Sequence, residues 1–313
     1  AKESGELNIM VESLDLEKAL EQVNVAVIND DEMEENKGPD GALGHGTFGW
    51  VRKGVYKGST PVAIKELVFN SKEMTPDEVV KDIINEIKAF SIVEKLHSAI
   101  VKFYGVWKQS SRICFIFELI DGTDLNKICD KMDDKTKLQV VIDICDVVGT
   151  LHNSKLIHRD IKPSNVMIDN NTGKVRIIDF GTVKIAKNEN TFTVNQKGTD
   201  NYMSPELIKI IELEGDEEND ICHFSVSPKV DVWAVGCVIS EIFSGIIPWK
   251  NVVGNNSAAV RKYLLKKPTF PIPDTVKDEK IINLIKMATE VDLDKRSTSL
   301  ELKEAAQKVL SEL

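Results

Sequence analysis

The residues best suited to chemistry lie in the run HRDIKPSN at residues 158–165 and in a second run, DFG, that begins at Asp179. Asp160 is a carboxylate that can accept a proton from a hydroxyl group. Asn165 and Asp179 carry the hard oxygen ligands that Mg²⁺ prefers, and Lys162 adds a positive charge. A base, metal ligands and cations around the γ-phosphate are what phosphoryl transfer requires. The two runs therefore predict a site for phosphoryl transfer from ATP.

A glycine-rich run, GHGTFGWV at residues 44–51, could hold the phosphates of such a nucleotide. The spacing of Gly44, Gly46 and Gly49 also occurs in dinucleotide-binding folds, where a helix must begin directly after the glycines. Here residues 50–56 alternate in polarity, which is typical of a strand. We therefore expect a β-turn-β hairpin whose backbone approaches phosphates closely, and the alternation excludes a dinucleotide site.

The run VAIK at residues 62–65 places Ala63 and Lys65 on one face of a predicted strand. A helix is predicted to follow, because Thr75 and Glu78 have the spacing of a capping box. Glu86 lies in the apolar stripe of that helix and needs a buried partner, as Lys65 does. We interpret the two as an ion pair.

These sites must be positioned by two different kinds of structure. Strands are predicted at residues 50–56, 61–68, 100–107 and 113–119, and the chain beyond residue 135 is mainly helical in pattern. The sequence thus predicts an α+β protein with a β-rich first lobe, one main helix in that lobe, and a larger α-helical second lobe.

Residues 1–37 are predicted to be an N-terminal extension. An amphipathic helix is indicated over residues 14–23, and an acidic stretch at residues 30–35 is followed by a breaker run at residues 37–40. Our interpretation is a docked helix followed by a solvated linker; a regulatory arm is the alternative.

In their order along the chain, these runs resemble the signature motifs of eukaryotic protein kinases. The resemblance covers about residues 38–312 and implies a bilobal kinase domain at 38–313, with lobes at 38–119 and 120–313 and ATP in the cleft between them. It implies that Asp160 is the catalytic base, that Asn165 and Asp179 bind magnesium, and that Lys65, held by Glu86, contacts the α- and β-phosphates.

The resemblance also implies how the nucleotide is held. The run FELI at residues 117–120 is similar to the hinge, so that the backbone of Glu118 and Ile120 would bind the adenine edge, with Phe117 as gatekeeper. The residues implied to contact ATP are Leu43, Gly44, Gly46, Gly49, Val51, Ala63, Lys65, Phe117, Glu118, Ile120, Met167 and Asp179. Phe90, Phe103, His158 and Phe180 match an apolar column that links the lobes in active kinases.

Later motifs bear on the substrate. Lys162 and Thr199 imply transfer to serine or threonine of protein substrates, although the ending MSPE at residues 203–206 leaves dual specificity open. Asp231 begins the helix implied to support the catalytic loop, and Arg296 matches the arginine that pairs with Glu206. The alternatives from other classes are a nucleotide-binding pseudokinase scaffold, disfavoured because no catalytic motif is missing, and a small-molecule phosphotransferase, disfavoured by the peptide-platform run at 198–206.

Regulation is predicted at the activation segment, residues 179–206. Arg159 precedes Asp160, a pattern linked in this family to phosphorylation of that segment. Thr191 and Thr193 are the natural acceptors, for an upstream kinase or for autophosphorylation, and a phosphate there could pair with Arg159.

Composition sets further limits. The net charge of −10 argues against a nucleic-acid-binding protein and favours substrates with basic segments. No apolar run is long enough to cross a bilayer, so we expect no membrane partner. The five cysteines are scattered without zinc spacing, which indicates reduced buried thiols and a cytoplasmic protein, with the nucleus as an alternative.

Overall fold

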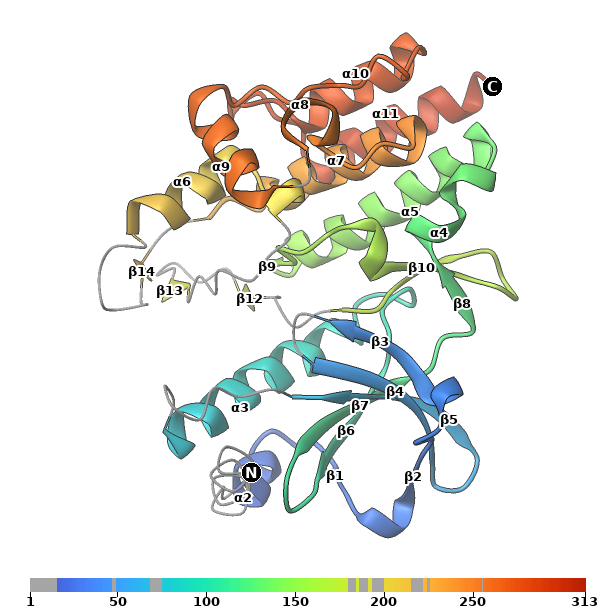
Figure 1. Ribbon diagram of the computed structural model, residues 1–313, viewed down its shortest axis with the longest axis vertical. Helices are drawn as coiled ribbons and strands as arrows, with labels where there is room; N and C mark the ends of the chain where they lie inside the picture. The colour runs from blue at the N-terminus through green and yellow to red at the C-terminus, as the bar shows by residue number, and fades with distance from the viewer. Residues whose placement is uncertain are drawn as a thin grey trace. The chain divides into compact units, whose positions relative to one another are not determined.

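The computed structural model describes residues 16–46, 49–67, 75–179, 184–185, 191–192, 200–214, 222–223, 226–254 and 256–313 (Figure 1). The chain divides into two compact units, Ala1–Ile120 and Asp121–Leu313. The described part of the first unit is β-rich with one long helix, and that of the second is mainly helical. This confirms the predicted α+β class.

A seven-stranded sheet forms the first unit, in the order β1-β6-β7-β5-β4-β2, with β3 also paired to β4. All neighbouring strands are antiparallel except β1 and β6, which run parallel. The strands are β1 (Val27–Ile28), β2 (Met33–Glu35), β3 (Ala42–Gly46), β4 (Gly49–Tyr56), β5 (Thr60–Glu66), β6 (Phe103–Lys108) and β7 (Ile113–Glu118).

The glycine-rich run forms the predicted hairpin. Gly46 at the end of β3 pairs with Gly49 at the start of β4, and residues 47–48 between them lie outside the described residues. The next turn joins β4 to β5 and places Lys57 and Gly58 at φ of 51° and 71°. Glycine tolerates this left-handed conformation because it lacks a Cβ. No helix follows the glycines, so the exclusion of a dinucleotide fold holds.

The helix α3 (Pro76–Val93) begins with the predicted capping box. The Thr75 side chain accepts from the Glu78 backbone N–H, while the Glu78 carboxylate accepts from the Thr75 N–H at 2.7 Å. Val79, Ile83 and Phe90 are buried along one stripe, as predicted. The short helix α2 (Leu16–Glu21) is in contact with α3 and buries Leu16 and Leu20.

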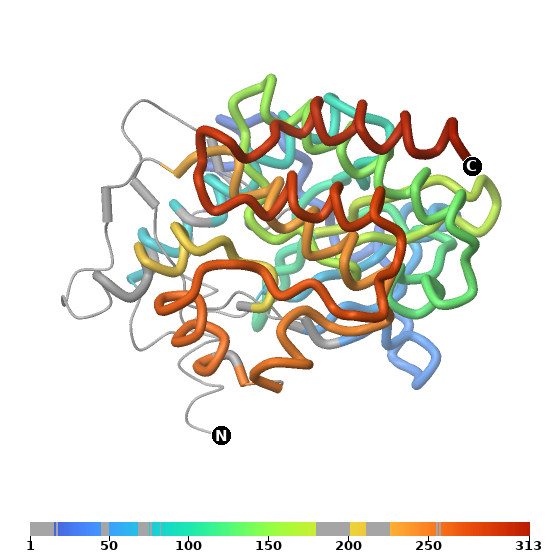
Figure 2. Tube along the Cα trace, turned by 90° about the horizontal axis from the view of Figure 1, so that it is seen from above, coloured from blue at the N-terminus to red at the C-terminus, as the bar shows by residue number. Residues whose placement is uncertain are grey.

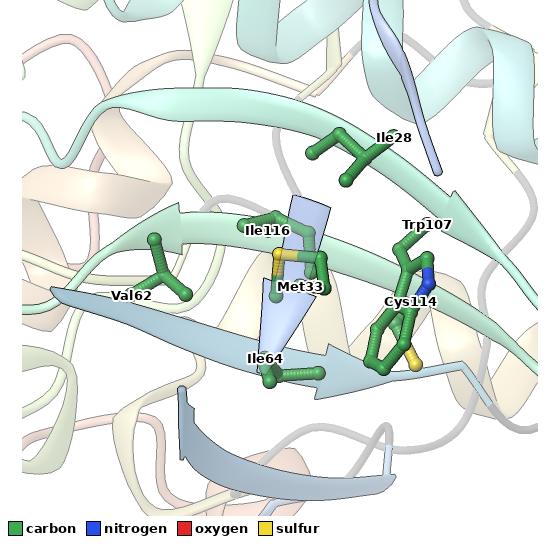
Figure 3. Close-up of a cluster of buried hydrophobic side chains, with 7 residues drawn as sticks. All are labelled: Ile28, Met33, Val62, Ile64, Trp107, Cys114 and Ile116. Carbon is green, nitrogen blue, oxygen red and sulfur yellow. The ribbon is translucent and has the colours of Figure 1, made fainter. Parts of the chain in front are cut away.

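The segment before residue 38 differs from the solvated linker that its acidic composition suggested. Val27 and Ile28 add a parallel strand to β6, and Met33 to Glu35 add a strand to β4. Ile28 and Met33 are buried with Val62, Ile64, Trp107, Cys114 and Ile116 in one apolar cluster (Figure 3). Our linker interpretation was wrong because charge pattern does not report pairing with distant strands.

Helices dominate the second unit. α5 (Asp134–Asn153) begins at the N-cap Asp133 and packs against α11 (Ser299–Ser311), so that the C-terminal helix lies beside the middle of the chain (Figure 2). The central helix α7 (Lys229–Ser244) is almost entirely buried and ends at Gly245, whose φ is 70°. The other helices are α4 (Leu125–Ile128), α6 (Pro205–Glu214), α8 (Lys250–Val253), α9 (Ser257–Lys266) and α10 (Glu279–Ala288).

Short strands complete this unit. β10 (Val166–Asp169) pairs with β8 (Gly122–Asp124) on one side and with β11 (Val175–Ile177) on the other. β9 (Leu156–Ile157) pairs with β12 (Lys184–Ile185), and β13 (Thr191–Phe192) pairs with β14 (Cys222–His223). The short 3-10 helices are η1 (Asp30–Glu32), η2 (Pro39–Gly41), η3 (Cys129–Lys131), η4 (Pro163–Asn165) and η5 (Asp200–Tyr202).

The cysteines and the helices of the described residues relate to two predictions from composition. Cys114, Cys129, Cys145 and Cys237 are buried free thiols, as predicted, and the side chain of Cys222 lies outside what is described. Among the described helices, none combines the length and the apolar composition needed to cross a membrane.

Candidate active site

Asp160, Lys162 and Asn165 meet in the loop between β9 and β10. The Asn165 amide donates to Asp160 Oδ2 at 2.9 Å and to the Asp160 backbone carbonyl at 2.9 Å. Lys162 Nζ lies 3.0 Å from the same Oδ2 atom. The helix η4 begins at Pro163 and turns the chain so that Asn165 points back at Asp160. The loop therefore presents a carboxylate, a cation and an amide within one hydrogen-bonded cluster.

Asp231 holds this loop from the N-terminal end of α7. Its carboxylate accepts from the backbone N–H groups of His158 at 2.8 Å and Arg159 at 2.7 Å, and lies 2.9 Å from His152 Nε2. Arg159 has φ of 67°, a conformation that is costly for a residue with a side chain. The hydrogen bonds keep the pKa of the buried Asp231 carboxyl below its ordinary value, although burial acts in the opposite direction as the largest single cause. The buried carboxylate thus fixes the strained residue that precedes Asp160.

Burial also lowers the pKa of the two residues before Asp160. Desolvation lowers the pKa of His158 below its ordinary value, which disfavours the protonated ring. Desolvation lowers the pKa of Arg159 to about 10, which leaves its guanidinium charged at pH 7. Asp231 and Asp160 act against both shifts.

The β10–β11 hairpin brings Asp179 next to this cluster along the backbone. Val166 pairs with Ile177, and the Ile178 N–H then donates to the Asn165 carbonyl at 3.1 Å. Asp179 follows Ile178 directly in the sequence. This backbone hydrogen bond therefore brings Asp179 close to Asn165. Phe180 and Gly181 lie outside the described residues. The half-buried Met167 lies on β10 opposite Arg176 and Asp124.

In the first unit, one face of the sheet carries the residues predicted to hold the nucleotide. Lys65 lies opposite Val51 on β4 and Phe115 on β7, and Ala63 lies opposite Phe117. Residues that face each other across strands, or alternate along one strand, share a face. Ala63 and Lys65 are therefore on one side of the sheet, as predicted, and Val51 and Phe117 share that side. The buried Val62 and Ile64 are on the other side.

Helix α3 covers part of this face through aromatic contacts. The Phe90 ring lies 5.3 Å from Phe103, 5.7 Å from Phe115 and 5.2 Å from Phe117, measured between ring centroids. Glu86 precedes Phe90 by one helical turn and so lies on the same side of α3. Since Phe115 is the cross-strand neighbour of Lys65, the register brings Glu86 toward the strand that carries Lys65.

The predicted hinge, residues 117–120, begins with the last two residues of β7 and continues beyond the strand. The Glu118 N–H donates to the Lys102 carbonyl at 3.0 Å, and the Leu119 N–H to the Pro61 carbonyl at 3.4 Å. Phe117 is buried among the aromatic rings, and Leu43, at the irregularity in β3, is 42% exposed. The backbone of this segment is thus held on both sides by the sheet.

Two contacts organise the region after residue 200, while Thr199 and Thr193 lie outside the described residues. Arg296, with a side chain that is 0% exposed, forms two bonds to Glu206, at 2.6 and 3.1 Å, and the pair was predicted from the motifs. The Tyr202 hydroxyl donates a short hydrogen bond to Glu241. Burial raises the pKa of Tyr202 and of Glu241.

The roles of His152 and Tyr202 in these contacts were not indicated by any pattern in the sequence. His152 lies in the last turn of α5, one residue before the helix ends, and no sequence pattern relates it to Asp231.

Comparison with known proteins identifies the family. The model of the protein kinase domain matches residues 39–309. The chain is 28% identical over 263 residues to mitogen-activated protein kinase kinase kinase 1 of Arabidopsis thaliana, with 83% of this chain and 40% of that protein covered. It is 30% identical over 246 residues to mitogen-activated protein kinase kinase kinase 5 of the same plant, with 76% and 32% covered. It is 30% identical over 276 residues to the probable serine/threonine-protein kinase nek2 of Dictyostelium discoideum, with 84% and 60% covered.

The chain thus spans less than half of the two plant relatives and 60% of the third protein. The family match itself extends over most of the chain and includes every motif from the glycine-rich hairpin to Arg296. This chain belongs to the protein kinase domain family.

Proposed function

We propose that the chain is a serine/threonine protein kinase that transfers the γ-phosphoryl group of Mg-ATP to hydroxyl groups of protein substrates. The cluster of Asp160, Lys162 and Asn165, held by the buried Asp231, is the observation that carries this proposal. We further propose that residues 38–313 form the catalytic domain, with lobes at 38–119 and 120–313, and that residues 1–37 precede it.

Asp160 is proposed as the general base. The substrate hydroxyl gives its proton to the Asp160 carboxylate as its oxygen bonds to the γ-phosphorus. The bond from that phosphorus to the β–γ bridging oxygen breaks, and ADP leaves with the electron pair. Lys162, whose Nζ lies 3.0 Å from Asp160 Oδ2, is proposed to stabilise negative charge on the transferring group.

Asn165 and Asp179 are the proposed magnesium ligands. The Asn165 Nδ2 group is committed to Asp160, which leaves the amide oxygen as the atom available to a cation. An amide oxygen and a carboxylate suit Mg²⁺, which would neutralise charge on the phosphates when bound. Lys65, with Glu86 as its partner, is proposed to contact the α- and β-phosphates.

The remaining proposals concern nucleotide, substrate and control. Leu43, the glycines of the β3–β4 hairpin, Val51, Ala63, Met167 and the hinge would contact ATP. The net charge of −10 supports substrates with basic segments. Thr191, whose backbone lies in β13, and Thr193 are proposed phosphorylation sites. Buried free thiols support a reducing compartment, the cytoplasm or the nucleus.

The test is phosphate transfer from labelled ATP with Mg²⁺ to generic basic proteins, followed by identification of the labelled amino acid. We expect label on serine and threonine. Asp160→Asn should abolish transfer while ATP affinity stays nearly unchanged, because the substitution removes the base and leaves the nucleotide contacts. Asp274→Asn, the same change at an exposed position, is the matched control and should behave as wild type.

Other outcomes select the alternatives. Label on tyrosine as well would establish dual specificity. Binding of Mg-ATP without transfer to any protein would make the chain a pseudokinase, and the proposed function would be abandoned.

A further inference from the structure

Residues 16–35, which precede the family match at residue 39, form a segment that we call the N-terminal strap. The strap comprises α2, β1, η1 and β2. It pairs with β6, at one end of the strand order β6-β7-β5-β4, and with β4 at the other end. It therefore bridges strands that the core of the sheet does not join directly.

The strap completes the apolar core on one face of the sheet. Ile28 is 1% exposed and Met33 is 7% exposed, and both pack with Val62 and Ile64 of β5 (Figure 3). Lys65 follows these residues on the same strand and points to the opposite face. The strap is thus the support behind the strand that carries the phosphate-contacting lysine.

Charged contacts add to this support. Asp30 Oδ1 accepts from Trp107 Nε1 at 2.7 Å, and the Arg112 guanidinium lies 5.4 Å from the centre of the Trp107 ring. Arg112 forms a short ion pair with Glu35 of the strap and lies 3.3 Å from Glu66, the neighbour of Lys65. Asp30 is therefore tied to β6, and Glu35 is linked through Arg112, in the turn between β6 and β7, to Glu66 on the strand that carries Lys65.

The strap also reaches the helix that carries Glu86. α2 is in contact with α3, and its Leu16 and Leu20 are 1% and 0% exposed. Both partners of the proposed Lys65–Glu86 pair thus lie on elements that the strap contacts.

Two glycines of the sheet are adapted to the strap. Gly105 on β6 has φ of 149°, and the Ala26 carbonyl, which accepts from the Val106 N–H at 3.0 Å, occupies the place of a Cβ. At Gly54 on β4, a Cβ would lie 2.7 Å from the Glu34 carbonyl oxygen. A side chain at either position would meet strap backbone, so the domain itself is shaped for a docked strap.

We propose that the strap positions β5 and α3, and hence Lys65 and Glu86, for phosphoryl transfer, with Leu20 and Asp30 as its anchoring residues. This inference rests on the proposed kinase function. Undocking the strap would let the two elements shift independently. A displacement of about 1 Å at a reacting group can lower the rate about 100-fold.

Four variants of the full chain test the proposal. Leu20→Ala removes the anchor of α2, and Asp30→Ala removes the acceptor for Trp107. Asp30→Asn keeps an oxygen acceptor at that position, and Asp31→Ala removes the same charge from the exposed neighbour. Steady-state kinetics, thermal unfolding and hydrogen exchange of residues 16–35 are measured for each.

We expect Leu20→Ala and Asp30→Ala to speed exchange in the strap and to lower kcat at least about 10-fold, with KM for the protein substrate unchanged. Asp30→Asn and Asp31→Ala should retain wild-type kcat. A merely structural strap would lower the unfolding temperature without this selective loss of kcat in the folded protein. If Leu20→Ala fails to fold, Asp30→Ala, which removes one hydrogen-bond acceptor, decides the question.

Faster hydrogen exchange in the strap with wild-type kcat and KM would overturn the proposal. Unchanged exchange in both Leu20→Ala and Asp30→Ala would also overturn it, because these residues would then not anchor the strap. Absence of transfer by the wild-type chain would instead refute the kinase function. The role of the strap would then be tested by the affinity of each variant for a non-hydrolysable ATP analogue. Leu20→Ala and Asp30→Ala should bind this analogue more weakly than the wild-type chain.

Discussion

Replacing Asp231 by asparagine should damage both stability and transfer, although the two side chains have nearly the same shape. The carboxylate uses Oδ1 for Arg159 N–H and Oδ2 for His158 N–H and His152 Nε2. An amide offers only one acceptor oxygen. At least one buried backbone N–H therefore loses its acceptor, whichever way the amide turns.

The expected loss of stability follows from the number of backbone N–H groups that lose their acceptor. A buried donor left without an acceptor costs about 1–3 kcal/mol, and bonds to a charged acceptor are stronger than neutral ones. We expect Asp231→Asn to lower the free energy of unfolding by about 2–4 kcal/mol. The backbone at His158 and Arg159, where Arg159 has φ of 67°, would lose at least one of the two bonds that hold it, and Asp160 would move with it. We expect kcat to fall about 100-fold.

Urea unfolding followed by circular dichroism measures the first quantity, and transfer at saturating Mg-ATP measures the second. His152→Ala provides a graded comparison, because it removes one of the three donors and leaves both backbone bonds. Its effect should be smaller, about 1 kcal/mol. A misplaced loop implies a much larger loss of kcat than about twofold. If Asp231→Asn keeps kcat within about twofold of wild type, the reasoning is refuted.

Three further predictions concern other parts of the chain. Arg296→Leu leaves Glu206 without its partner and should cost about 3–5 kcal/mol of unfolding free energy in urea; a cost no larger than that of an exposed substitution would contradict the role of the pair. The Arg112 hydrogen bond lowers the pKa of Glu35 below its ordinary value of 4.5, so its contribution to stability is present above that pH and is lost as the pH falls through the folded-state pKa. Glu35→Gln should therefore flatten the decline of unfolding free energy measured from pH 5 to 3, and an unchanged slope would argue against this contribution. Burial raises the pKa of Cys114 and Cys145 to about 12, so neither thiol should react with a disulfide reagent at pH 8 until urea unfolds the chain; fast labelling of the native protein would show that these sites open.

The residues that could do chemistry were recognisable from sequence because phosphoryl transfer restricts both their types and their order. Asp160, Asn165 and Asp179 lie in loops next to short strands, and local rules such as the proline at 163 indicated how the chain turns there. The capping box before α3 was predicted because it depends on a few residue types at fixed spacing, whereas the Arg296–Glu206 pair was implied by the resemblance to protein kinases.

The contacts that hold these residues depended on tertiary structure. The acidic stretch at residues 30–35 had the composition of a solvated linker, yet Glu35 is buried because Arg112, far along the chain, supplies its counter-charge. His152 reaches Asp231 only because α5 and α7 pack together. Local patterning therefore determined which groups are present and which elements they occupy. Long-range packing decided which buried charges find partners, because a side chain's environment is set by residues that are distant in sequence and close in space.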